Sequence, residues 1–216
     1  MLNEDDVAKL LPEPLTLDRD DDGLAWLSVV SFRMTRMRWR DRVPLPFAST
    51  YAQVNIRVYV VAPDGTPGVF FLRNLVSNRL AARAGRVLYG MPYVYQAVRL
   101  HSTDERASCT TTAAELPHDV RGELGNWLTG HEQDVSNRLF FLTERYPLFS
   151  VRRNSVHLSR MLHPPWPLRQ LVNTVQTHGA VRALGLGDAL EPYSELQFSP
   201  GVQVQMWPPR RLVKAN

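Results

Sequence analysis

The chain has 216 residues, of which 44% are hydrophobic and 21% are charged, so it can bury one sizeable core and is not a disordered chain. No stretch approaches the roughly 18 apolar residues that a membrane-spanning helix needs. Glu4, Asp5 and Asp6 stand where an export signal would require basic residues followed by an apolar run. We therefore expect a single domain over residues 1–216, located in the cytoplasm and without a membrane partner.

Two segments early in the chain predict a hairpin. Before the hairpin, residues 24–34 are apolar and β-branched enough to form a buried strand. Residues 51–61 alternate strictly between apolar and polar side chains, as one strand with two distinct faces does. Turn-forming residues at 63–66 connect this strand to a second strand predicted over residues 68–74.

A helix is predicted over residues 78–89, with Ser77 or Asn78 as its N-cap, Gly90 at its end, and Leu80 and Val87 among the residues on its apolar side. Further strands are predicted over residues 93–100, 107–114, 148–152, 156–162 and 169–175. Short helices are predicted over residues 136–144 and 179–184, and a last hairpin is predicted to end within 202–211. Residues 119–128 fit either a helix or a strand. Many strands in one domain must hide their edges. The expected class is α+β, mostly antiparallel β, with a closed or half-closed sheet.

Several strings along the chain resemble one bacterial family. QVNIRVYV, PGVFF, LYGMPYVYQA, FLTERYPLF, HPPWPL and MWPPRR occur, between about Leu10 and Arg211, in the order and spacing of the uncharacterised YqjF-like proteins. The resemblance implies an acetoacetate decarboxylase-like β-barrel with a few peripheral helices and a ligand cavity, and it implies no established activity. Relatives usually carry a further aromatic-rich first strand, so we expect either that the barrel lacks this strand or that the true start lies upstream.

The lysine content bears on chemistry. Only two of the 25 Lys and Arg residues are lysines, Lys9 and Lys214, and each is close to an end of the sequence. An acetoacetate decarboxylase mechanism needs a barrel-lining lysine that forms a Schiff base with a β-keto acid. Relatives also commonly have Glu at the position of Gln53, whose amide does not titrate. We therefore expect no lysine-dependent decarboxylation, and whether the protein is an enzyme stays open.

The polar side of strand 51–61 supplies the first candidate ligand-binding residues, Gln53, Asn55 and Arg57. If this side faces solvent, the strand is simply half exposed. If it faces a cavity, the amides and the guanidinium could bind a carboxylate or another small anion. The sequence favours neither alternative.

Other candidates lie further along the chain. Tyr93, which shares a face with Tyr95, could line the same cavity, although aromatic pairs usually pack in a core. In the FLTERY string, Arg145 and Tyr146 are candidate ligand-binding residues and Glu144 is a weak catalytic candidate, against the simpler interpretation of a junction fixed by ion pairs and a tyrosine hydroxyl.

The remaining polar residues carry weaker signals. His163 precedes two prolines and is a weak candidate acid or base. No second histidine stands at ligand spacing, so no metal site is expected, and the absence of a Gly-rich phosphate loop indicates no nucleotide cofactor. Cys109, the single cysteine, is expected to be a small buried residue.

Arginine alternates with other residues over 36–42, so that Arg36, Arg38, Arg40 and Arg42 would share one face of an extended strand. This stripe could bind nucleic acid, but a solvated loop is the simpler interpretation because no second basic block or recognised nucleic-acid motif accompanies it.

Three hypotheses follow, in this order: a noncatalytic barrel that binds a small anionic ligand, a lysine-independent enzyme acting on small oxo acids, and a nucleic-acid or protein interaction module that uses the arginine stripe. The sequence leaves the ligand and the oligomeric state open.

Overall fold

The computed structural model describes residues 4–36, 38–39, 43–44, 50–111, 117–128, 137–177, 179–186 and 196–214. The helices in this part of the chain are short: α1 (Glu4–Ala8), α2 (Arg79–Ala84), α3 (Asn137–Thr143), α4 (Gly179–Arg182) and the π-helix η1 (Gly85–Tyr89), which continues α2. None of the described helices has the length and apolar character needed to cross a membrane.

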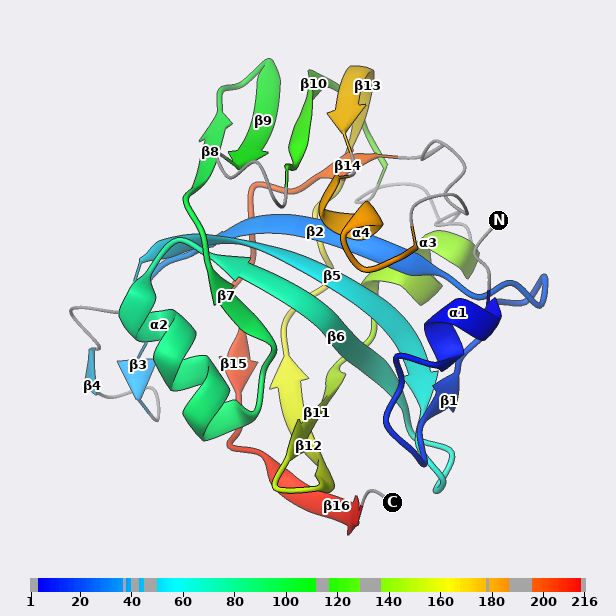
Figure 1. Ribbon diagram of the computed structural model, residues 1–216. Coiled ribbons are helices and arrows are strands. Elements are labelled where there is room, and N and C mark those ends of the chain that lie inside the picture. Colours follow the sequence, from blue (N-terminus) through cyan, green and yellow to red (C-terminus); the bar gives the residue numbers. More distant parts are fainter. Residues whose placement is uncertain are drawn as a thin grey trace.

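The larger sheet curls across the middle of the molecule (Figure 1). Its main path runs β1 (Thr16–Leu17), β5 (Tyr51–Val61), β6 (Pro67–Val76), β11 (Pro147–Arg152), β12 (Ser155–Leu162) and β15 (Gln205–Met206). Three further strands join its sides: β2 (Leu27–Met34) pairs with β5, β7 (Tyr93–Tyr95) with β6, and β16 (Arg210–Lys214) with β12.

The smaller sheet lies above the curled one in Figure 1 and has the order β14 (Gln197–Phe198), β13 (Arg169–Thr177), β10 (Asp119–Trp127), β9 (Arg106–Thr111) and β8 (Val98–Ser102). A separate ribbon pairs β3 (Arg38–Trp39) with β4 (Val43–Pro44). Among the described strand pairs, only β6–β7 and β6–β11 are parallel. The expected class, mostly antiparallel β with a few helices, is therefore confirmed.

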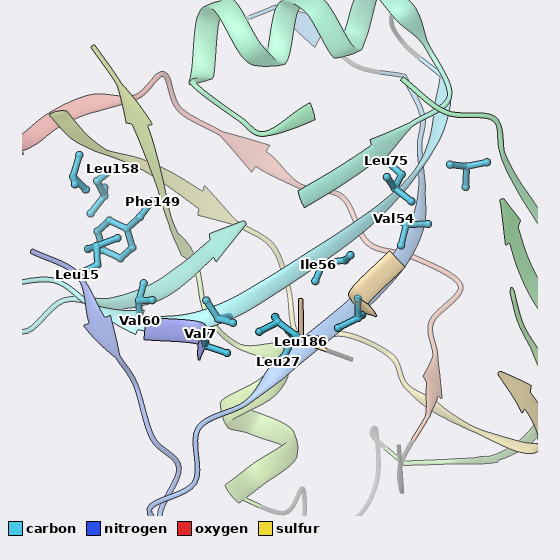
Figure 2. Packing of buried hydrophobic residues seen from close by; sticks show 14 of the residues in the cluster. Val7, Leu15, Leu27, Val54, Ile56, Val60, Leu75, Phe149, Leu158 and Leu186 are labelled. Carbon is cyan, nitrogen blue, oxygen red and sulfur yellow. The ribbon is translucent and has the colours of Figure 1, made fainter. Parts of the chain in front are cut away.

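β5 has the predicted bounds and forms the predicted hairpin with β6. Its apolar face packs in the main core, where Val54, Ile56 and Val60 meet Leu75 of β6 and Leu27 of β2 (Figure 2). Val7 of α1, Leu15 and Leu186 cover the same face, while Phe149 and Leu158 extend the cluster onto β11 and β12, so this face is closed by elements distant in sequence.

The helix predicted over residues 78–89 exists, but it changes type halfway. Asn78 caps it by accepting a hydrogen bond from the Ala81 backbone N–H at 2.9 Å, and Gly90 ends it in the left-handed conformation at φ 68°. The apolar side chains expected to pack are instead exposed: Leu80 and Val87 are 58% and 59% accessible, and they border the cavity described below.

Two further expectations are settled. Residues 119–128, which fitted either a helix or a strand, contain β10. The predicted final hairpin is wrong, because β15 and β16 each pair with β12 rather than with one another. Both strands are short and depend on a distant partner, so local sequence gives little sign of their pairing.

Candidate functional site

A large cavity of about 3040 Å³ is lined by β2 and β5, by the α2–η1 helix, by parts of the smaller sheet and by residues 196–208. This volume is several times the roughly 300–1,000 Å³ of ordinary small-molecule sites. A ligand would therefore occupy only part of it, and the polar groups on its wall indicate which part.

Gln53, Asn55 and Arg57, here called the polar row, line this cavity from β5. Gln53 and Asn55 are only 3% accessible, so the alternative of a solvent-exposed strand face does not hold for them. The Gln53 Nε2 atom donates to Asn55 Oδ1 at 2.8 Å, whereas Gln53 Oε1 is buried without a hydrogen-bond partner. Buried polar atoms are usually paired, so this unpaired oxygen marks a place where a further group could bind.

Asn74 adds a third buried amide, beside those of Gln53 and Asn55. It lies directly opposite Asn55 in the β5–β6 ladder and is fully buried, with neither its Oδ1 nor its Nδ2 atom hydrogen-bonded. Leaving such groups unpaired costs about 1–3 kcal/mol. Asn74 was not predicted from the sequence, because only the register of β6 against β5 brings it next to Asn55.

Arg57 is half-buried, and its guanidinium group makes one hydrogen bond within the protein and leaves one buried nitrogen unpaired. Its Nη2 atom donates to the Leu142 carbonyl at 3.0 Å, and the Tyr59 hydroxyl donates to the same oxygen at 2.7 Å. Leu142 lies in the last turn of α3, where carbonyls lack helical partners and where a positive charge is favourable. The Arg57 Nε atom is buried without a partner, so part of the guanidinium is not used by this contact.

Three tyrosines enclose the end of the polar row nearest Gln53. Tyr93 accepts a hydrogen bond from the Gln53 amide nitrogen, which leaves Gln53 Oε1 unpaired, and it also hydrogen-bonds to Tyr51, with Tyr89 close by. Burial raises the pKa of Tyr51 to about 12 and also raises the pKa of Tyr93, so both remain neutral phenols over the physiological range. Tyr95, expected to accompany Tyr93, lies at the surface beneath the Arg79 guanidinium, 4.7 Å from its ring centre.

The FLTERY residues are held mainly by one another and by the N-terminal segment. The Tyr146 hydroxyl donates to Glu144 Oε2 at 2.7 Å, and this hydrogen bond raises the pKa of Tyr146 to about 12. Arg145 pairs with Asp18 at 3.1 Å and stacks over the Phe141 ring. Arg145 lines the cavity, but Glu144 and Tyr146 are not among its described lining residues, which agrees with the interpretation of a structural junction.

His163 lines the cavity and is 8% accessible. Its ring lies between those of Tyr146 and Trp166, with centroid distances of 4.7 and 4.9 Å. Its Nδ1 atom is 2.9 Å from the Pro164 carbonyl oxygen and must carry a hydrogen to bond there, because a carbonyl only accepts. The Nε2 atom is therefore the one that could exchange a proton with a bound molecule.

A second polar group lies on another part of the cavity wall, formed by Ser31, Cys109 and His118. The Ser31 hydroxyl is 3.2 Å from His118 Nε2, and Ser31 also hydrogen-bonds to Cys109. Burial raises the pKa of Cys109 to about 11, so it is a buried thiol, as expected. Within the described residues, no group of three or more His, Cys, Asp or Glu side chains is placed to hold a metal ion.

The arginine stripe is only partly described. Arg36 has φ 55°, a left-handed backbone, so the extended conformation needed to align the stripe is interrupted at its first member. Arg40 and Arg42 lie outside the described residues.

Comparison with known proteins places the chain in a family. It belongs to the DUF2071 family, described as an uncharacterized conserved protein, whose model matches residues 1–203. It is 28% identical over 212 residues to the uncharacterized protein YqjF of Bacillus subtilis (strain 168), which covers 94% of this chain and 83% of that protein. The resemblance inferred from the sequence strings is confirmed.

Solved structures agree on the fold. Acetoacetate decarboxylase from Legionella pneumophila matches with a TM-score of 0.67 at 11% identity, covering 99% of this chain and 82% of that one. The enduracididine biosynthesis enzyme MppR, complexed with pyruvate, matches with a TM-score of 0.61 at 14% identity, covering 99% and 85%. An acetoacetate decarboxylase-like enzyme from Sphingomonas wittichii RW1 gives 0.62 at 13%, covering 97% and 86%. The fold is acetoacetate decarboxylase-like, and at these identities only the fold is shared.

Proposed function

We propose that this protein binds a small anionic metabolite in the large cavity, at the polar row. The observation that carries the proposal is that Gln53 Oε1 and Arg57 Nε are buried and have no hydrogen-bond partner, while both residues line the cavity. The pattern of unpaired groups suits a molecule that carries an anion together with a hydroxyl or keto group.

The two ends of the polar row suit different parts of such a ligand. Arginine binds carboxylates through charge-assisted hydrogen bonds, so the anionic group belongs at Arg57. The Gln53 carbonyl oxygen accepts a hydroxyl hydrogen, and rotation of the amide would present Nε2 to a keto oxygen instead. Gln53 and Arg57 are four residues apart on an extended strand, a distance of roughly 13 Å. Because the arginine side chain covers part of this distance, the space between the two groups suits a metabolite rather than a polymer.

Similarity to MppR supports the anionic class without identifying the ligand, since that protein is complexed with pyruvate, a small oxo acid. Binding here proceeds without a Schiff base in this proposal. Lys9 is a surface residue paired with Asp6 at 2.9 Å, and Lys214 lies in β16. No lysine occurs among the described residues that line the cavity.

A thermal-shift screen against small carboxylates, oxo acids and sugar acids tests the proposal. A ligand at 100 times its Kd stabilises the folded state by about 2.7 kcal/mol. We expect that gain to disappear in Arg57→Met and to weaken in Gln53→Leu, while Arg99→Met, at an exposed arginine of β8, retains it. The proposal is wrong if no anion stabilises the wild-type protein, or if the stabilisation survives both cavity substitutions.

Catalysis on a small oxo acid is the second candidate, favoured by one observation. His163 lines the cavity, with its Nδ1 committed to a backbone carbonyl and its Nε2 available for proton transfer. Turnover of the bound ligand that is abolished in His163→Gln, with binding retained, would establish an enzyme. Binding without turnover would favour the noncatalytic barrel.

A further inference from the structure

A second, much smaller cavity of about 250 Å³ lies at the turn of the β11–β12 hairpin, apart from the polar row. Its lining residues are Arg152, Arg153, Ser155, His157 and Arg211. Three guanidinium groups, a hydroxyl and an imidazole thus surround one small hollow.

The strand register explains why these side chains meet. Arg152 and Ser155 are directly opposite at the end of the hairpin, and His157 is directly opposite Arg211 on β16. The two residues between, Arg153 and Asn154, have φ values of 49° and 53°, the left-handed pair that a tight two-residue hairpin turn requires. The cluster is therefore built on three paired strands and a defined turn rather than on a long loop.

Two of the side chains are also oriented by backbone contacts. The Arg152 Nη1 atom donates to the Leu88 carbonyl at 3.3 Å, at the end of η1. The His157 Nδ1 atom donates to the Ser155 carbonyl at 3.0 Å, so its Nε2 atom remains for another partner.

The arginines of this cluster form no ion pair with the carboxylates that the structure describes. Six other basic residues form ion pairs with such carboxylates, but Arg152, Arg153 and Arg211 form none. Lys214 is opposite Ser155 in the same ladder. Like charges on neighbouring strands are destabilising, so a bound anion would stabilise this end of the sheet.

We propose that this hollow binds a phosphoryl group, either inorganic phosphate or the phosphate of a small phosphomonoester. Guanidinium forks match phosphate oxygens geometrically, and several of them converging on one point suit a dianion better than a monovalent carboxylate. The hollow is smaller than an ordinary small-molecule site, so it fits the phosphoryl group while the rest of a phosphomonoester stays outside. This proposal does not depend on ligand binding at the polar row.

The test uses the full chain and three probes at constant ionic strength: inorganic phosphate, glycerol phosphate and a short single-stranded oligonucleotide, each compared with chloride in thermal-shift and titration experiments. We expect phosphate and glycerol phosphate to bind, and at least tenfold weaker binding in Arg153→Asn, which keeps a residue that tolerates the turn, and in Arg211→Gln. Arg99→Gln should bind phosphate like the wild type, and Arg211→Lys should recover part of the affinity that Arg211→Gln loses.

Circular dichroism spectra of each variant separate loss of binding from loss of folding. Stabilisation by phosphate no greater than by chloride would overturn the proposal, and so would unchanged phosphate affinity in folded Arg153→Asn and Arg211→Gln. Binding of the oligonucleotide alone, weakened equally by Arg99→Gln, would show a diffuse surface attraction instead of a phosphoryl site.

Discussion

β5 buries both of its faces, yet the two faces differ in how completely their side chains are satisfied. On one face Val54, Ile56, Val58 and Val60 have no accessible surface and belong to the main hydrophobic core. On the other, Gln53 and Asn55 are almost as buried, but Gln53 Oε1 lacks a partner. Burial alone therefore does not separate core from candidate site in this fold, whereas unpaired polar atoms do.

The largest effect is expected on the apolar face. Ile56→Ala removes methyl and methylene groups from a fully buried position and leaves a cavity, which should lower the free energy of unfolding by about 2–5 kcal/mol. Urea denaturation measures this change. Val87→Ala, at a side chain that is 59% accessible, serves as the control and should stay within about 0.5 kcal/mol of the wild type. Equal losses in both variants would contradict the assignment of Ile56 to the closely packed core.

An intermediate effect is expected on the polar face at high pH. The pKa of Tyr51 is raised from 10.0 to about 12 by burial, so the unfolded chain loses this proton first as the pH rises. The stabilising contribution is complete below pH 10 and is lost between pH 10 and 12, at up to about 1.4 kcal/mol per pH unit for one group. The free energy of unfolding, measured from pH 9 to 11, should fall less steeply with pH in Tyr51→Phe than in the wild type. A folded protein whose phenolate absorbance titrates fully near pH 10 would refute this explanation.

The smallest effect has the opposite sign. Asn74→Leu replaces a fully buried amide that has no hydrogen-bond partner by an apolar side chain of similar size, which should raise the free energy of unfolding by about 1 kcal/mol. Urea denaturation of the protein without added ligand measures it. A loss of stability instead would indicate that water or another group pairs with this amide, and the buried part of the site would then extend to Asn74.

The sequence predicts β5 well because its alternation is local, and it predicts the β5–β6 hairpin because the turn residues lie between the two strands. It could not decide whether Gln53 and Asn55 face solvent, since that depends on the curl of the sheet and on elements such as α3, whose Leu142 carbonyl contacts Arg57. The phosphoryl-site cluster was missed for a similar reason. Arg152 and Arg211 are far apart in sequence, and only the pairing of β16 with β12 brings them to one hollow.

For the helix predicted over residues 78–89, local sequence likewise predicts the ends but not the side that packs against the rest of the protein. Asn78 and Gly90 define its ends through local capping, and both were predicted. The packed side was not predicted correctly. The buried residues of the helix are Ala81, Ala82 and Gly85, and Gly85 lies so close to the Tyr93 ring that an added Cβ would be 2.5 Å from it. Leu80 and Val87, which local periodicity would have placed in the core, are exposed.

The two parallel pairings of β6 affect how the chain folds as it is synthesised. β5 can pair with β6 as soon as Val76 has left the ribosome, and β7 follows within about twenty residues. The edge of β6 that pairs with β7 also pairs with β11, through Val69 and Phe70 of β6 and Leu148 and Phe149 of β11. This part of the edge stays unpaired until β11 has been synthesised. Closing so long a loop is slow, and an unpaired strand edge can meanwhile pair with other chains. Nascent chains that stop before β11 should therefore be the species most prone to aggregate.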